Sequence, residues 1–131
     1  MFDIKDFKGK PFQWNGNGNP GYDCVSLVVA VLERLHGYVI DYPERGSHNI
    51  SLPRLPEIMK NHLERYLLPV STDLYEVGDV FLYQIYKEPC HMGIYVGQQK
   101  ILTALENKGV TTFSIYDETW LKRLTKVFRW Q

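Results

Sequence analysis

The sequence is poor in cysteine, with Cys24 and Cys90 as the two among its 131 residues. A small domain held together by disulfides carries more of them, so a disulfide framework is excluded. The scarcity favours synthesis in a reducing compartment. Neither cysteine is therefore assigned to a structural bridge.

Long apolar runs are also absent. The longest, Leu27–Leu32, is far shorter than the roughly 18 residues that a membrane span requires, and it fits a core helix. The opening segment, Met1–Asp6, lacks the apolar region of a secretory signal peptide. We therefore expect no membrane insertion and no signal peptide.

An excess of either charge is missing as well. The 15 basic residues balance the 15 acidic residues, which gives a formal net charge of zero. A basic surplus is the usual electrostatic sign of a nucleic-acid or acidic-membrane partner. The sequence gives no reason to expect either.

What the sequence does contain is enough apolar material for a core, 44% of its residues. That share argues against disorder, and the length fits one domain over residues 1–131. We find no internal repeat and no low-complexity segment.

Helical signals lie in the first half of the chain. The segment Phe2–Phe7 predicts a short helix, and Gly9–Gly21, rich in asparagine and glycine, predicts a loop. Asp23 is a typical N-cap for a helix over Cys24–His36, which Gly37 would close. The apolar residues of this helix recur at helical spacing and form one stripe.

The hydrophobic period changes in the second half. After a second predicted helix, Leu55–Tyr66, short runs of β-branched and aromatic residues alternate with glycines, which is typical of strands. Helices followed by an antiparallel sheet predict an α+β fold. The predicted strands are Asp79–Tyr83, His91–Val96, Lys100–Ala104, Val110–Tyr116 and, after a short helix over Thr119–Leu124, Val127–Trp130.

Cys24 lies where a nucleophile could be activated. Cysteine attacks carbonyl groups as the thiolate, and the first turn of a helix stabilises an anion through its unpaired N–H groups and its dipole. The same N–H groups could donate to a developing oxyanion. A base is also needed, and His91 is the candidate because it begins a predicted strand that could pack beside the helix.

Other interpretations of these residues stay open. A free cysteine is often a buried small hydrophobe, and the three other histidines occur outside any motif. Zinc would need a different spacing, because Cys24, Cys90 and His91 form no CxxC pattern. Adjacent residues on a strand also point to opposite faces. We therefore expect no metal site.

Four segments in order carry a further signal, and together they span nearly the whole chain: Lys10–Gly16, Tyr22–Val28, Glu76–Leu82 and His91–Gly97. They resemble the NlpC/P60 family of cysteine peptidases. The resemblance implies a papain-like α+β fold in which the helix with Cys24 packs on a small antiparallel sheet with His91.

The resemblance also implies a reaction and its residues. Members of the family hydrolyse amide bonds of the peptidoglycan stem peptide, with cysteine as nucleophile, histidine as base and a third polar residue that orients the imidazole. No cofactor is expected. On this sequence the catalytic positions fall on Cys24, His91 and Thr103, and the positions near the substrate or nucleophile fall on Phe12, Trp14, Asp23 and Val25.

Three positions depart from the family pattern. Phe12 keeps the ring of the family's tyrosine without its hydroxyl. The dipeptide Val25-Ser26 replaces Ser-Gly, which removes a hydroxyl offered to substrate and adds bulk where glycine permits close approach. Thr103 replaces a histidine, and its hydroxyl can accept from an imidazole N–H although it is short and uncharged.

A narrower resemblance is to the phage-tail branch of the family. It implies a virion component at the tail tip or hub, made in the host cytoplasm, with tail tip or hub proteins as partners. The segments that carry it are Gly37–Tyr42, Thr103–Val110 and Phe128–Trp130.

Alternatives remain at this stage. The three altered positions are also compatible with a weakened or inert structural adaptor at the tail tip. A small-molecule acyltransferase or amidase could use the same thioester intermediate. Within the site, Glu106 or Asn107 could orient His91 in place of Thr103, although no motif places them there.

Overall fold

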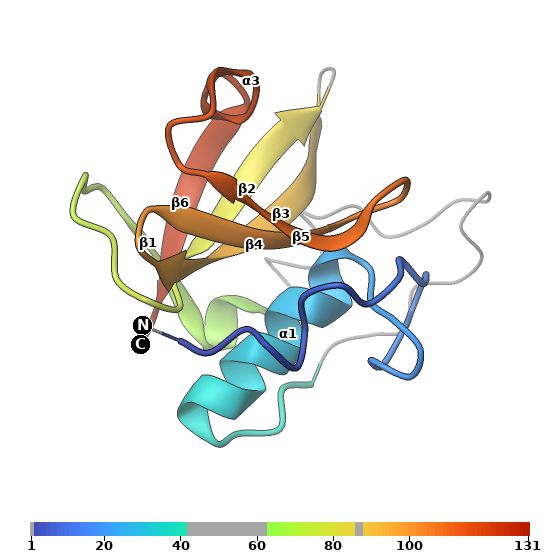
Figure 1. Cartoon of the computed structure of the whole chain (residues 1–131). Helices are drawn as coiled ribbons and strands as arrows, with labels where there is room; N and C mark the ends of the chain where they lie inside the picture. The colour runs from blue at the N-terminus through green and yellow to red at the C-terminus, as the bar shows by residue number, and fades with distance from the viewer. Residues whose placement is uncertain (1, 42–62, 86–87) are drawn as a thin grey trace.

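The computed structural model describes residues 2–41, 63–85 and 88–131, and it shows a long helix packed against an antiparallel sheet (Figure 1). The sheet has six strands in the order β1-β6-β2-β3-β4-β5, and α1 packs against β3 and β4. The predicted α+β class is confirmed. The elements are α1 (Cys24–His36), η1 (Leu63–Arg65), β1 (Leu67–Val70), β2 (Val80–Ile85), β3 (Glu88–Gly97), β4 (Lys100–Leu105), β5 (Gly109–Ser114), α3 (Glu118–Leu121) and β6 (Leu124–Trp130).

The helix α1 begins and ends where the sequence predicts. The Asp23 carboxylate accepts from the Ser26 N–H at 2.9 Å, and the Ser26 hydroxyl accepts from the Asp23 N–H at 3.0 Å, which forms a capping box. At the other end, Gly37 is left-handed and its N–H donates to the Glu33 carbonyl. Cys24 is therefore the first residue of the helix.

Side chains of the sheet divide between two clusters, because neighbouring residues of a strand point to opposite faces. In β2, Val80 and Leu82 join the buried stripe of α1 in the larger core. Phe81 and Tyr83 belong to a smaller cluster that is rich in aromatic rings. His91 pairs with Tyr83 across β2 and β3, and the two rings lie 6.4 Å apart, so His91 lies beside the aromatic cluster.

A half-buried ion pair joins the turn before β2 to the last strand. The Arg129 guanidinium donates to both carboxylate oxygens of Asp79 at 2.9 Å, and Asp79 is 1% exposed. Arg129 also contacts the Glu76 carboxylate at 2.7 Å. The paired geometry fixes the guanidinium against the carboxylate, and it ties together segments that lie far apart in the sequence.

Some predicted bounds differ from those observed. The predicted helix over Phe2–Phe7 is wrong: residues 5–9 form turns in which the Phe7 N–H donates to the Ile4 carbonyl, and burial of the Phe7 ring fixes this segment. The strand β3 begins at Glu88, so His91 lies inside the strand and does not open it.

The segment around the second predicted helix shows two further differences. Residues 55–62 lie outside the described residues, and Leu63–Arg65 forms a single 3-10 turn. The strand β1 was not predicted, because Pro69 is unfavourable in a strand; it is tolerated since β1 lies at the edge of the sheet. Within the described part of the chain, no helix is long and apolar enough to cross a bilayer.

Candidate active site

A short hydrogen bond joins two of the predicted catalytic residues. The Thr103 hydroxyl oxygen lies 2.7 Å from Nε2 of His91, and both side chains are buried. His91 is on β3 and Thr103 is on β4, the neighbouring strand. The structure therefore brings these two residues together.

The second contact of Thr103 determines which group is the donor in its hydrogen bond with His91. Its hydroxyl oxygen also lies 2.9 Å from the carbonyl oxygen of Met92, which can only accept. A hydroxyl has one proton, so the donor to Met92 has to be the acceptor for the imidazole. Neutral His91 then carries its proton on Nε2 and keeps a lone pair on Nδ1, which is the tautomer that a base needs if its target lies on the Nδ1 side.

The surroundings of His91 keep the imidazole neutral. The residue is 7% exposed, and its ring lies 5.0 Å from that of Trp120, centroid to centroid. Burial, and to a lesser extent the positive charge of Arg123, lowers the pKa of His91 to about 4. At neutral pH the ring is therefore able to accept a proton.

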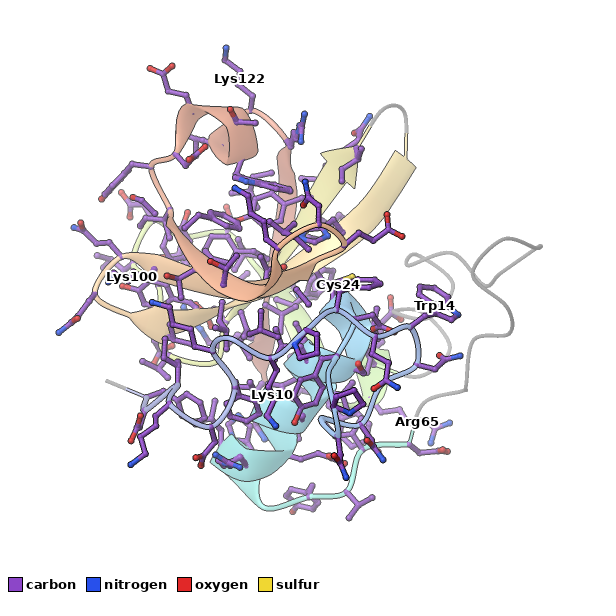
Figure 2. The ribbon with its side chains drawn as sticks, turned by 45° about the vertical axis from the view of Figure 1, so that its right-hand side comes forward. Lys10, Trp14, Cys24, Arg65, Lys100 and Lys122 are labelled. Atoms are coloured by element: carbon purple, nitrogen blue, oxygen red, sulfur yellow. The ribbon has the colours of Figure 1, made fainter. Side chains whose placement is uncertain are left out.

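Cys24 lies at the N-terminus of α1, with its thiol free of any disulfide and half-buried against the larger core. Figure 2 shows it at the end of α1 that lies against the sheet. The N–H groups of the first helical turn are arranged to stabilise a thiolate or an oxyanion. Because α1 packs on β3, the nucleophile and base positions are on neighbouring elements, and the contact between Cys24 and His91 stays a prediction.

The loop before the helix carries Phe12 and Trp14, both half-buried. Figure 2 shows Trp14 on this loop. Phe12 forms a parallel bridge with Tyr22 and packs against the larger core. The Tyr22 N–H donates to the Pro11 carbonyl, and a Cβ on Gly21 would overlap that carbonyl oxygen. Only glycine permits this close approach, so the loop folds back on itself directly before the nucleophile helix.

The structure shows how the residues beside Cys24 are packed. Val25 is completely buried in the larger core, so it packs the helix and offers no surface to a substrate. The Ser26 hydroxyl is used in the capping box and its bulk is accommodated there. Asp23, 1% exposed, accepts from the N–H groups of Ser26 and Asn15, which identifies it as a structural cap.

The structure places the two alternative orienting groups at the surface. Glu106 and Asn107 are exposed in the turn after β4. Among the described residues, no group of three or more histidine, cysteine, aspartate or glutamate side chains is arranged to hold a metal ion.

The aromatic surroundings of His91 were not predicted from the sequence. Trp120 and Phe113 stack with ring centroids 5.0 Å apart, and Tyr83 meets Trp120 edge to face at 5.4 Å. The Arg123 guanidinium lies 5.3 Å from the centre of the Trp120 ring. These residues come from three segments, β2, β5 and the region of α3, which the fold brings together, so the cluster could not be predicted from local pattern.

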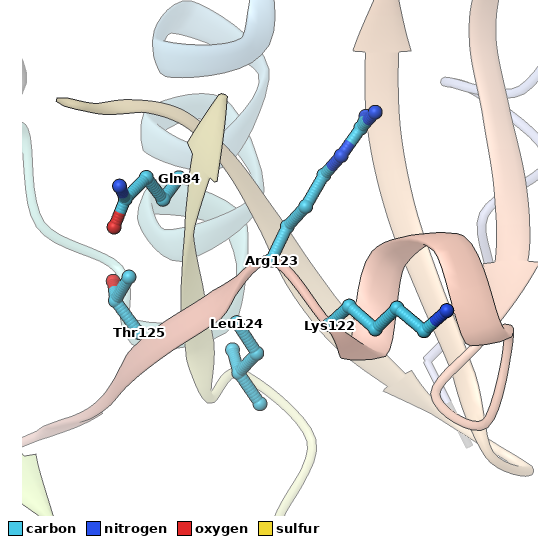
Figure 3. Close-up of a pocket in the computed structure, with 5 residues that line it drawn as sticks. All are labelled: Gln84, Lys122, Arg123, Leu124 and Thr125. Carbon is cyan, nitrogen blue, oxygen red and sulfur yellow. The ribbon is translucent and has the colours of Figure 1, made fainter. Parts of the chain in front are cut away.

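A shallow pocket opens beside this cluster, at the start of β6 (Figure 3). Figure 3 shows the long side chains of Lys122 and Arg123 leaving the backbone in different directions. The two cations therefore do not converge on one site. The lining residues are Gln84, Lys122, Arg123, Leu124 and Thr125.

Comparison of the chain with known proteins identifies a family. The NlpC/P60 family model matches residues 9–129. The chain is 28% identical over 116 residues to a probable endopeptidase p60 of Listeria welshimeri, covering 88% of this chain and 19% of that protein. It is 24% identical over 129 residues to the murein DD-endopeptidase MepS/murein LD-carboxypeptidase of Escherichia coli, covering 98% of this chain and 60% of that protein. The chain thus spans less than two thirds of the length of these relatives.

Solved structures show the same fold. An NlpC/P60 family protein from Bacillus cereus matches with a TM-score of 0.70 and 15% identity, over 96% of this chain and 37% of that chain. At this level of identity the likeness concerns the fold alone. It confirms the predicted NlpC/P60-type arrangement of one helix on an antiparallel sheet.

Proposed function

Since the chain belongs to the NlpC/P60 family, we propose that it is a cysteine peptidase that hydrolyses amide bonds of the peptidoglycan stem peptide. The observation that carries the proposal is the hydrogen bond from His91 Nε2 to the Thr103 hydroxyl. It leaves Nδ1 unprotonated, as a base for Cys24 requires. The relatives named as endopeptidases support the substrate class.

The proposed reaction has two halves. Nδ1 of His91 takes the thiol proton of Cys24 while the sulfur attacks the amide carbonyl carbon, and the N–H groups at the start of α1 stabilise the oxyanion. The C–N bond then breaks, the leaving amine takes the proton from His91, and a thioester remains on Cys24. Water attacks the thioester with His91 again as the base, which releases the acid and restores the thiol.

Thr103 supports both halves without touching the substrate. As His91 becomes an imidazolium, Nε2–H continues to donate to the Thr103 hydroxyl, and that hydroxyl continues to donate to the Met92 carbonyl. The lowered pKa of His91 means that the resting imidazole is neutral, so it is able to take a proton during the attack.

A cleavage assay tests the proposal. The purified chain, under reducing conditions, is incubated with peptidoglycan stem peptides, and new amine and acid termini are detected by mass spectrometry. We expect cleavage by the wild type and by Cys90→Ala, and none by Cys24→Ala or His91→Ala. Absence of cleavage by the wild type, also with intact particles or their hub added, would exclude the peptidase.

We also propose that the chain acts in the tail tip or hub of a tailed phage or a related particle. The three segments that resemble the phage-tail branch support this, and one of them contains Thr103, which holds the imidazole. The test is mass spectrometry of purified particles. The chain should be present in particles at a constant ratio to tail proteins, and its presence in lysate with absence from particles would exclude a virion role.

An inert adaptor at the same location is the second candidate. It is favoured by Phe12, which lacks a hydroxyl, and by the low exposure of His91. Particles that carry Cys24→Ala separate the two functions. An adaptor predicts normal assembly and normal infection, whereas a peptidase predicts normal assembly with slower entry through the cell wall.

A further inference from the structure

The short helix α3 has one notable side chain. None of its residues is buried, and Trp120 alone among them contacts the aromatic cluster. The Asp117 carboxylate caps the helix by accepting from the N–H groups of Thr119 and Trp120 at 3.0 and 3.3 Å. The capped turn fixes the backbone from which the indole projects.

The indole is held in one orientation by its neighbours. It stacks on Phe113 with an angle of 15° between the rings, and it meets Tyr83 at 74°. Both arrangements are favourable for aromatic pairs. The Trp120 ring then lies 5.0 Å from the His91 imidazole, at 32°.

We propose that Trp120 is a positioning residue that covers the His91 imidazole and shields its hydrogen bond to Thr103 from water. The inference rests on the proposed function, because it assigns Trp120 a part in holding the base. It also accounts for the departure at Thr103. A threonine hydroxyl is a short, uncharged partner that fixes one nitrogen, and the indole restrains the rest of the ring.

Shielding matters because a hydrogen bond between buried groups is stronger than one in contact with water. The Thr103 side chain is completely buried and His91 is 7% exposed. Loss of the indole would admit water to both partners. The imidazole would then rotate more freely and would be solvated as the cation.

Burial and one neighbouring positive charge act on the His91 imidazole in the same direction. Tyr83 faces it from β2, Thr103 from β4 and Trp120 from α3, and Cys24 lies on α1, which packs against β3. The charged group that acts on it is Arg123, whose guanidinium lies over the Trp120 ring. Its positive charge lowers the pKa of His91 further, as a smaller effect than burial.

Removal of Trp120 should therefore raise the pKa of His91 on both counts. Water would reach the imidazole, and the guanidinium of Arg123 would lose the ring on which it lies. Truncation of the neighbouring Leu121, which is 50% exposed, removes a side chain of the same helix without opening the imidazole.

The experiment is an NMR titration of the His91 ring in the full chain, for the wild type and for Trp120→Ala, Trp120→Phe and Leu121→Ala. We expect the pKa of His91 to rise by about one unit or more in Trp120→Ala, to rise less in Trp120→Phe and to stay unchanged in Leu121→Ala. An unchanged pKa in a folded Trp120→Ala would overturn the proposal. If that variant does not fold, Trp120→Phe decides: a smaller rise supports the proposal, and an unchanged pKa of His91 would overturn it.

Kinetics on a stem peptide give a second readout. With Trp120→Ala we expect a fall in kcat of about ten-fold, little change in KM and an acid limb of the pH profile that moves to higher pH. A rise in KM alone would overturn the proposal by making Trp120 a substrate contact. The titration needs no activity, so failure of the proposed peptidase leaves this test intact.

Discussion

At the scale of single residues, the site depends on the two hydrogen bonds of the Thr103 hydroxyl. Thr103 donates to the Met92 carbonyl and accepts from His91, so the threonine fixes the tautomer of the base. The resemblance to the family indicated this position, and the residues alone could not show which nitrogen it contacts. That information arises only when β3 and β4 come together.

Replacement of Thr103 tests the tautomer directly. Thr103→Val keeps the shape but leaves Nε2–H of His91 without its acceptor, so kcat/KM on a stem peptide should fall by about ten-fold or more. Thr103→Ser keeps the hydroxyl and should stay within a few-fold of the wild type. Equal rates for the valine and serine variants would exclude a role for the hydroxyl.

The lowered pKa of His91 also predicts a pH dependence of stability. The unfolded state takes up a proton near the ordinary pKa of 6.5, whereas the folded state does so only near 4. The contribution of His91 to the free energy of unfolding is therefore fully present above pH 6.5 and declines as the pH falls toward 4. The decrease in the free energy of unfolding from pH 7 to pH 5 should be about 2 kcal/mol for this group.

Urea unfolding at the two pH values measures this decrease. His91→Gln serves as the control, because glutamine does not titrate. The decrease should be smaller in the variant by about the amount assigned to His91. If wild type and variant lose the same free energy between pH 7 and pH 5, the burial of a neutral imidazole is contradicted.

At the scale of elements, the sequence predicts well the helix ends that local interactions set. It predicts less well the elements and bounds that tertiary packing sets. Asp23 and Gly37 mark both ends of α1, because caps are local interactions. The strand β1, with Pro69, and the turn around Phe7 are set by distant partners, β6 and the core. Trp120 was missed for the same reason, since its neighbours are brought to it by the fold.

The helix cap gives a prediction at this scale. Asp23→Ala removes the acceptor for the Ser26 and Asn15 N–H groups, so the free energy of unfolding should fall by about 1 to 2 kcal/mol. Asp23→Asn keeps a capping oxygen and should lose less. Chemical denaturation measures both, and equal stability of the alanine variant and the wild type would contradict the capping role.

At the scale of the whole molecule, two clusters and one ion pair hold the site's elements together. The larger core fixes α1 on β3 and β4, and the aromatic cluster packs beside the His91 imidazole. The Asp79–Arg129 pair locks the turn before β2 to β6, which borders the pocket beside Arg123. Neither the clusters nor the ion pair could be predicted from the sequence, because the partners are far apart along the chain.

Two ion pairs of different burial allow a matched test. Asp79→Ala should lower the midpoint of thermal unfolding by more than about 5 °C, because it leaves the Arg129 guanidinium without its buried partner. Asp6→Ala breaks the exposed pair with Arg34 and should change the midpoint little. Similar midpoints for the two variants would contradict the structural role of the pair with buried Asp79.

The most direct test of the central claim, that Cys24 acts with His91, is the rate at which iodoacetamide alkylates Cys24 at pH 7. Peptide mass spectrometry separates this rate from that of Cys90. Because a base on β3 assists the thiol, the wild type should react about ten-fold faster at Cys24 than His91→Ala does. Equal rates at Cys24 in the two proteins would contradict the account.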